Sequence, residues 1–504
     1  MSEGLETVRK IWAWNEGKPR PRGETINVHI GDDDDAMIVA FLRMGGESRP
    51  WGVAFGKCDE EPTILTVAEG RNRTRVADMM IEFAPVLLEH FRHPQHSTDS
   101  LSNWEANSHR QIWLPGPTHV EMLHYIALSY ARTKWDRDGI ELLKAIGNLS
   151  NCLYIEQQRP GQQTVMTASQ AIRDTFVFPA SSVRQAHLGY LLGWLQGGKS
   201  RDSRLATARK ASNKAVATVL DPEFERKAVQ PLVEQWGEAN RKEDAKGQKA
   251  AEDAVKKALT PELLRRWELT RDAISVLRAE KRRVNSGIST LVAISKKEFN
   301  RVWGERATRE DDGGDPFWPN PFTDYNTRMA AGGYHQRVAD EQKARHYLVH
   351  GDRELQREEL AVGHGIIGVT SKVSTDEPEW TIKYSYPDLP TIRPGGYLVI
   401  AGAPEMKLIV QEVDPEDRTV IAVPQWKNAK RQYGDKGLPS RDRAWKGQNL
   451  VFLEDQPFGL SDRLAGIARR RSDDPNDISN RMNIRQRQHA ANDDEGAVNP
   501  ESDD

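Results

Sequence analysis

The sequence predicts a multidomain α+β protein that ends in a small β-barrel and a disordered tail. Three observations predict this fold class. Strand-like segments dominate residues 1–100, apolar residues at helical spacing dominate 112–310, and short strand-like segments recur over 363–458. A chain of 504 residues has room for about three domains of ~150 residues each. We therefore expect a small N-terminal mixed α/β domain, a central α-helical region, a connector over 311–362 and a C-terminal barrel.

The composition is that of a soluble protein. Charged residues make up 29% of the chain, the mean hydropathy is −0.69, and no apolar run approaches the ~18–20 residues of a membrane span. The first residues lack the basic and apolar segments of a secretory signal. Two cysteines, Cys58 and Cys152, are too few for a disulfide framework or a cysteine-rich zinc site. These features predict a cytoplasmic protein without a metal or cofactor.

The first 100 residues contain four segments with the pattern of strands, followed by a helix. Gly45 and Gly46 lie between the second and third segments, as in a hairpin. The helix expected over 76–91 has apolar residues spaced for one buried face. The expected strands are Ile26–Ile30, Ala36–Met44, Pro50–Phe55 and Pro62–Val67.

Two segments of the helical region share one pattern. Residues 123–131 and 188–195 are apolar helical runs, and each precedes a polar turn and a second amphipathic helix. Their offset of 65 residues is about twice the ~34-residue period of tetratricopeptide hairpins. A degenerate third unit fits between them, with its second helix from Val165 to Arg173. The region resembles a tetratricopeptide-like array in the order and period of its helices, which implies a groove for a protein partner.

Helix start signals and basic residues mark the rest of this region. Thr118 and Glu121 have the spacing of a capping box. Asp221-Pro222 and Thr260-Pro261 each place a proline at the first position of an expected helix. Residues 199–309 contain 26 Lys/Arg and 16 Asp/Glu, an excess typical both of a face that meets an anion and of ordinary exposed helices. The densest cluster is a secondary basic patch of Arg278, Lys281, Arg282 and Arg283.

A barrel is predicted after a connector that is rich in proline and aromatic residues and ends in a short helical hairpin. Short strands with glycine bends and no helices between them resemble an SH3-like or OB-like barrel. The run over 393–423 is similar to barrels of RNA-processing proteins and of some helicases. Residues 469–504 are charged and poor in apolar residues, which predicts disorder. The expected strands are Ile366–Val373, Trp380–Tyr384, Tyr397–Ala401, Lys407–Val413, Thr419–Val423 and Leu450–Leu453.

The long connection between the last two barrel strands, residues 425–448, is the strongest candidate binding site. It holds seven Lys/Arg and two Asp, with three aromatic residues among them. Cations can follow a phosphate backbone while aromatic faces stack on unpaired bases, although the aromatic residues could instead fold back onto the barrel. The candidate nucleic-acid-binding residues are Trp426, Lys427, Lys430, Arg431, Tyr433, Lys436, Arg441, Arg443, Trp445 and Lys446.

One motif matches a phosphate-binding loop. Gly193 to Ser200 satisfies the pattern G-x-x-x-x-G-K-S. A true phosphate loop follows a buried strand, whereas the residues before Gly193 have helical spacing, so the turn of a helical hairpin explains the motif better. No other catalytic motif stands out, and no catalytic residue is assigned.

The sequence therefore favours a non-enzymatic cytoplasmic scaffold subunit of a nucleic-acid-associated complex. It would bind a partner protein through the helical repeats and single-stranded nucleic acid through the basic, aromatic barrel loop. Two alternatives remain open at this point. One is a pure protein–protein adaptor without nucleic-acid binding, and the other is a nucleotide hydrolase that uses Lys199 and Ser200.

Overall fold

A computed structural model of the chain describes residues 3–33, 35–46, 48–91, 109–311, 327–370, 380–424 and 449–455. The chain divides into two compact units. Unit 1 comprises Met1–Gln158, Gln162–Pro316 and Gly351–Leu355, and unit 2 comprises Arg159–Gly161, Phe317–His350 and Gln356–Asp504. The predicted binding loop 425–448 and the predicted disordered tail 469–504 lie outside the described residues.

A five-stranded mixed sheet forms the centre of unit 1, in the order β4-β3-β2-β5-β6. Strands β2, β5 and β6 are parallel to one another, while β3 and β4 extend the sheet by antiparallel pairing. Three strands come from segments in which the sequence predicts strands, but β5 and β6 come from the region predicted to be helical. The strands are β2 (Ala36–Arg43), β3 (Pro50–Lys57), β4 (Thr63–Thr66), β5 (Gln111–Leu114) and β6 (Val165–Thr167).

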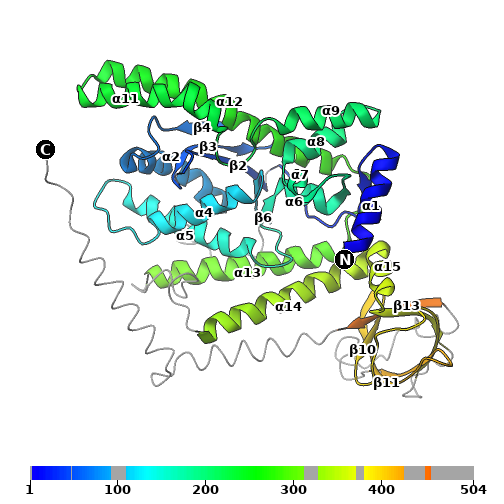
Figure 1. Ribbon diagram of the computed structural model, residues 1–504. Coiled ribbons are helices and arrows are strands. Elements are labelled where there is room, and N and C mark those ends of the chain that lie inside the picture. Colours follow the sequence, from blue (N-terminus) through cyan, green and yellow to red (C-terminus); the bar gives the residue numbers. More distant parts are fainter. Residues whose placement is uncertain are drawn as a thin grey trace. The chain divides into compact units, whose positions relative to one another are not determined.

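Helices cover both faces of this sheet (Figure 1). The long helix α12 (Ala245–Arg278) lies along one face, and α2 (Arg73–Phe91), α4 (Pro117–Tyr130) and α5 (Ile140–Gln157) lie on the other. Seven of the eight residues of β2 are therefore buried, as expected for a strand that is covered on both faces. One hydrophobic core contains side chains from Ile26 to Phe299, so the N-terminal segment and the helical region fold together.

The helical region differs from a simple series of hairpins. The pair α4–α5 connects two parallel strands, β5 and β6, whereas α8 (Leu188–Gln196) and α9 (Arg201–Ser212) form a helical hairpin. The helix predicted from Val165 is wrong at its start, because 165–167 pair with β5 and α6 begins at Ala168. The strand predicted over 26–30 is absent from the described residues, since only Ile26 bridges to another segment, at Val284.

The helix predicted to begin at Pro261 is instead continuous with the preceding residues. Helix α12 passes through Pro261, and the hydroxyl of Thr260 donates to the carbonyl of Lys256 one turn earlier, so Thr260 is no N-cap. The start signal at Asp221 is confirmed, because its carboxylate accepts from the backbone N–H groups of Glu223 and Phe224. The other elements of this region are α6 (Ala168–Thr175), α7 (Ser182–Gln185), α10 (Pro222–Phe224), η2 (Glu225–Val229), α11 (Gln230–Arg241) and α13 (Ser286–Asp311).

Segments distant in sequence complete unit 1. Helix α1 (Glu3–Glu16) precedes β1 (Arg20–Pro21), which pairs with β7 (Phe176–Val177). The carboxylate of Asp352 accepts the backbone N–H of Thr25 at 2.8 Å, and Arg9 pairs with Glu354 at 3.0 Å. Asp352 is almost fully buried. Residues 351–355 therefore belong to the structure of unit 1 although they follow α14 (Thr327–Gly351) in the chain.

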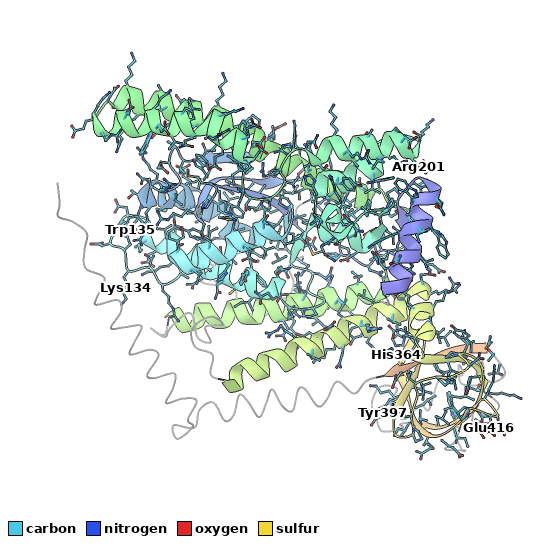
Figure 2. All side chains as sticks on the ribbon, in the orientation of Figure 1. Lys134, Trp135, Arg201, His364, Tyr397 and Glu416 are labelled. Carbon is cyan, nitrogen blue, oxygen red and sulfur yellow. The ribbon has the colours of Figure 1, made fainter. Side chains whose placement is uncertain are left out.

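The described part of unit 2 contains α14 and α15 (Arg353–Ala361), of which 356–361 belong to this unit, and a closed barrel in the order β10-β11-β12-β9-β8-β13. Each of the six strands predicted for this region is confirmed, and their buried side chains form a separate core. Figure 2 marks Tyr397 and Glu416 on the barrel. The strands are β8 (Gly365–Thr370), β9 (Trp380–Tyr386), β10 (Tyr397–Ile400), β11 (Ala403–Asp414), β12 (Thr419–Pro424) and β13 (Asn449–Asp455).

Among the helices of the described residues, none has the length and apolar character needed to span a membrane.

Candidate functional site

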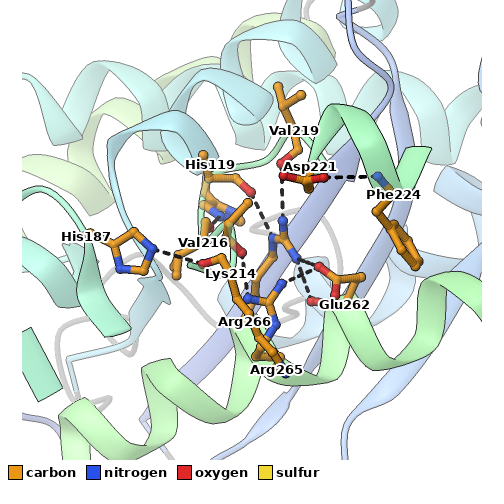
Figure 3. A network of polar contacts seen from close by, with 12 residues as sticks. His119, His187, Lys214, Val216, Val219, Asp221, Phe224, Glu262, Arg265 and Arg266 are labelled. Atoms are coloured by element: carbon orange, nitrogen blue, oxygen red, sulfur yellow. Dashed lines mark hydrogen bonds and ion pairs between the residues drawn. The ribbon is translucent and has the colours of Figure 1, made fainter. Parts of the chain in front are cut away.

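The carboxyl ends of the parallel strands β2, β5 and β6 lie at the same end of the sheet, where α/β proteins commonly bind ligands. In this chain a segment over 214–219, which we call the strap, lies at the end of β2 (Figure 3). The backbone N–H of Arg43, the last residue of β2, donates to Thr218 O at 2.9 Å. The backbone N–H of Thr218 donates to the hydroxyl of Thr118 at the start of α4. Thr118 thus serves the strap and not the predicted capping box, and Gly116 is the N-cap of α4.

Each of the six consecutive carbonyls of the strap accepts a hydrogen bond from another element. Those of Ala215, Ala217 and Val219 meet two arginines of α12. The donor–acceptor distances run from 2.8 to 3.2 Å. From Lys214 to Val219 the donors are His187 Nε2, Arg265 Nη1, His119 Nε2, Arg266 Nε, the Arg43 backbone N and Arg266 Nη2.

The two histidines bind the strap in the same way. Nδ1 of His119 accepts the backbone N–H of Phe41, and Nδ1 of His187 accepts that of Tyr190. Each ring therefore carries its proton on Nε2 and donates it to the strap, as a neutral imidazole. Burial lowers the pKa of His119 to about 3. His119 is thus a structural donor.

Arg266 is the centre of this network, because its side chain is fully buried and contacts two strap carbonyls. It also donates to Glu262, both to the backbone carbonyl at 2.8 Å and to the carboxylate at 2.9 Å. Burial lowers the pKa of Arg266 to about 10, so the guanidinium stays charged at neutral pH. The charge is compensated by one carboxylate and by backbone dipoles, as a buried charge requires. The strap is therefore held at the carboxyl end of β2 by buried donors of the chain itself.

The amino ends of the parallel strands carry a second buried polar cluster. The side chain of Gln111 accepts the Gly31 backbone N–H at 2.8 Å and donates to Gln163 O at 2.8 Å. Nε2 of His90 contacts Gln111 O, and Nε2 of His109 contacts Gln163 O. Burial lowers the pKa of both histidines to about 4. These groups satisfy one another and stabilise the strand ends as neutral donors.

The segment that matches a phosphate loop forms the turn between α8 and α9, as the helical spacing predicted. Ser200 is the N-cap of α9 and accepts the Ser203 backbone N–H at 3.2 Å. A Cβ on Gly193 would lie 2.6 Å from the Cα of Ala208, so this glycine allows two helices to approach closely. The motif residues thus have packing and capping roles.

We expect Gly193→Ala to destabilise unit 1 by about 1–3 kcal/mol, because the added methyl group overpacks the contact between α8 and α9. Lys199→Ala, in the exposed turn that follows α8, should change stability by less than about 0.5 kcal/mol. Thermal unfolding with and without ATP and Mg²⁺ measures both effects. A nucleotide-dependent rise in Tm that Lys199→Ala removes would contradict the packing interpretation.

Two residues of the secondary basic patch make structural contacts, and the other two are exposed to solvent. Arg278 forms an ion pair with Asp33 and donates to Gly31 O at 2.6 Å. Arg282 donates to Gly23 O at 2.9 Å. These two arginines hold the N-terminal segment against the end of α12, whereas Lys281 and Arg283 are exposed. Anion binding by the patch stays a prediction.

The barrel places both ends of the predicted binding loop at one end of the barrel. Strand β12 ends at Pro424 and β13 begins at Asn449. Ala422 pairs with Trp380 at the start of β9, and Asn449 pairs with Val369 near the end of β8. The connections 371–379 and 425–448 therefore both leave the barrel at this end. The ten candidate residues of the loop lie outside the described residues, so their binding role stays a prediction.

No protein-family model matches the chain, and comparisons with curated proteins and with solved structures give no match.

Proposed function

We propose that the protein is a non-enzymatic, cytoplasmic scaffold subunit that binds single-stranded nucleic acid through the loop 425–448. The observation that carries this proposal is the closed barrel, in which a 24-residue basic and aromatic connection joins two strands at one end. A closed barrel leaves no strand edge for pairing with a partner, so contacts of a small barrel are made by its loops and outer surface.

The chemistry of the loop supports this function. Its Lys and Arg residues exceed its acids by five, and Trp426, Tyr433 and Trp445 stand among them. Arginine and lysine neutralise phosphates, and aromatic rings stack on bases with ~1–3 kcal/mol per base. We propose that the barrel belongs to the SH3-like or OB-like class. We propose also that helices of unit 1 form a tetratricopeptide-like surface for a protein partner.

Charge reversal at Lys430, Arg431, Arg441 and Arg443 should abolish binding of labelled single-stranded DNA or RNA and its dependence on salt. Each phosphate that is no longer neutralised lowers the slope of log Kobs against log salt by ~0.7 for a single strand. The measurement is a fluorescence-anisotropy titration at several salt concentrations. The matched control reverses four exposed lysines of α12, which are Lys246, Lys249, Lys256 and Lys257.

Binding that survives the loop variant unchanged would exclude the loop as the site. Equal losses in the loop and control variants would show only a general charge effect. Loss confined to the loop variant supports the proposed function, and Trp426→Ala then tests whether base stacking contributes to it.

A second candidate function is a pure protein–protein adaptor, and one observation favours it. The connection 371–379, which leaves the same end of the barrel, contains Asp376, Glu377 and Glu379 against a single Lys372. Pairing of the basic loop with these carboxylates would leave little charge for nucleic acid. In that case the purified protein shows no salt-dependent binding, and neutralising the three acids creates it.

A further inference from the structure

Helix α1 has an apolar surface on the side that faces solvent, which we call the α1 ridge. It consists of Val8, Ile11, Trp12 and Trp14, which are 40%, 53%, 49% and 40% exposed. These are four of the twelve large apolar side chains that are exposed among the described residues. The helix lies at the edge of unit 1 (Figure 1). Single exposed apolar residues are ordinary on a protein surface, whereas a contiguous group of them marks an interaction site.

The spacing of these residues makes the ridge continuous. Val8, Ile11 and Trp12 follow the i, i+3, i+4 pattern of one helix face, and Trp14 follows Ile11 by three positions. Because successive residues of a helix are ~100° apart, Ile11 lies at the centre of the ridge, with Trp12 on one side and Trp14 on the other. A helix packs against a second helix with side chains at this spacing.

The charged residues of α1 contact unit 1 and are absent from the ridge. Arg9 is buried and pairs with Glu354 at 3.0 Å. Glu6 pairs with Arg22 at 2.9 Å. Over 4–15, every residue described as exposed is uncharged. A surface helix ordinarily has the reverse arrangement, with apolar residues toward the core and charges toward solvent, so this inversion indicates that a further surface covers the ridge.

An arginine lies against each tryptophan of the ridge. The guanidinium carbon of Arg20 is 5.1 Å from the ring centroid of Trp12, and that of Arg201 is 4.8 Å from the ring centroid of Trp14. Tryptophan and arginine are the residues that most often dominate the free energy of protein association, whereas lysine, glutamate and aspartate are depleted from interface centres. The ridge and its flanks therefore have the composition of an interface centre.

The carboxyl-terminal end of α1 lies against the start of α9. A Cβ on Gly17 would lie 2.8 Å from the Cβ of Arg201, and Figure 2 marks Arg201 at this end of α1. The arginines here are compensated by acids of their own segments. Arg20 pairs with Glu16 at 3.3 Å, and Arg201 pairs with Asp202 at 3.4 Å. The arginines thus support the tryptophans without an excess of charge.

Two lysines at this end remain without a paired acid. Lys18 follows α1 and Lys199 lies two residues before Arg201, and both lysines are exposed. No ion pair found among the described residues includes either of them. Acidic residues of a partner would complement these lysines, and acidic residues are favoured in the first turn of a helix. A partner helix that runs antiparallel to α1 has its first turn at this end.

We propose that the α1 ridge binds an amphipathic helix of a partner protein, which runs antiparallel to α1 and has acidic residues in its first turn. Apolar side chains of the partner pack around Ile11 and between the two tryptophans, and its carboxylates reach Lys18 and Lys199. A second copy of α1 offers less, because Glu6 of its first turn is already paired with Arg22. This inference rests on the proposed scaffold function and gives its protein partner a defined surface and chemistry.

The test uses the full chain and a labelled peptide of about 18 residues, which is long enough for an Ala-rich helix to form. The peptide carries leucines at i, i+3, i+4 and i+7 spacing on one face and three glutamates in its first turn. One control peptide replaces the glutamates by lysines, and another distributes the leucines evenly around the helix. In fluorescence anisotropy the acidic peptide should have a Kd at least about tenfold lower than either control.

Ile11→Asp should raise the Kd of the acidic peptide at least about tenfold, because a charge at the centre of the ridge is buried without a partner on binding. Leu128→Asp is the matched control, since Leu128 on α4 is 62% exposed, and it should leave the Kd unchanged. Lys18→Glu combined with Lys199→Glu should reverse the preference, so that the lysine peptide binds more tightly than the glutamate peptide. Equal Tm values confirm that all variants fold.

Weaker binding by Ile11→Asp together with the reversed preference supports the inference. Equal binding of the evenly distributed peptide, an unchanged preference in the double lysine variant, or no binding of the acidic peptide at about 100 μM overturns it. A wild-type dimer in analytical ultracentrifugation that Ile11→Asp dissociates assigns the ridge to a second copy of the chain. Binding of vesicles with anionic lipids that Ile11→Asp abolishes assigns it to a membrane surface. Either result overturns the partner helix.

The nucleic-acid titrations separate this inference from the proposed function. Ile11→Asp should bind single-stranded nucleic acid as the wild type does, because the loop 425–448 is unchanged. Failure of the acidic peptide to bind a protein that retains nucleic-acid binding overturns only the inference. Specific peptide binding by a protein without affinity for nucleic acid overturns only the nucleic-acid part of the proposed function.

Discussion

Arg266→Ala should destabilise unit 1 by about 3–5 kcal/mol, because removal of this fully buried side chain takes the donor away from two strap carbonyls and leaves a cavity. The carbonyls of Ala217 and Val219 each lose a donor, and Glu262 loses its contact with the Arg266 side chain. The vacated volume adds a cavity next to the strap. The effect is near the upper limit for a single substitution.

Urea unfolding followed by tryptophan fluorescence measures this loss, and hydrogen exchange of residues 214–219 localises it. Lys257→Ala, an exposed site on the same helix, is the matched control and should stay within about 0.5 kcal/mol of the wild type. Because the chain has two units, urea unfolding can show two transitions. Arg266→Ala should lower the midpoint only of the transition in which the strap loses its protection from hydrogen exchange. Equal stability of the two variants would mean that the strap does not depend on Arg266.

The protein should lose stability steeply as the pH falls from about 6.5 to about 4. His90, His109 and His119 are buried as neutral rings, with their pKa values lowered by desolvation to about 4, about 4 and about 3. Below pH ~6.5 these histidines bind protons in the unfolded chain, whereas in the folded chain they stay neutral down to their lowered pKa values. The stabilisation is therefore complete above that pH and disappears as the pH approaches the folded pKa values. Each histidine contributes up to about 3 kcal/mol.

Asp174 acts in the opposite direction over part of this range. Burial raises its pKa to about 6, so its protonation as the pH falls favours the folded chain. Unfolding free energies measured between pH 4 and pH 7.5 give the net slope. His109→Gln should lower that slope by about 1.4 kcal/mol per pH unit between pH 5 and 6, because one proton fewer is taken up on unfolding. A flat profile for the wild type would show that these histidines are charged in the folded protein.

The barrel could be predicted from the sequence because its signals are local. Alternating apolar residues and turns such as Arg393-Pro394-Gly395-Gly396 define short antiparallel strands, and three of the six strand pairings join strands that follow one another in sequence. Strands β5 and β6 gave no comparable signal. They are four and three residues long, and their parallel pairing depends on β2 and on the crossover helices α4 and α5. Tertiary packing, and not periodicity, determines them.

The strap illustrates the same limit for a functional site. Its own pattern, with Val216, Thr218 and Leu220 buried, is that of a strand. Yet its carbonyls are paired mainly by side chains from three separate helices or turns, and its strand pairing is a single parallel bridge between Val219 and Arg43. The sequence alone assigned neither His119 nor Arg266 a role.

The buried carboxylate of Asp352 also determines where the chain can be cut. Truncation anywhere between 316 and 350 would remove the acceptor for the Thr25 N–H, and it would leave Arg9 without Glu354. A fragment of unit 1 that ends after α13 would therefore lack the contacts that hold Thr25 and Arg9 in place. The shortest fragment in which unit 1 is complete extends to about residue 355. A shorter fragment should regain these contacts when 351–355 are added as a separate peptide.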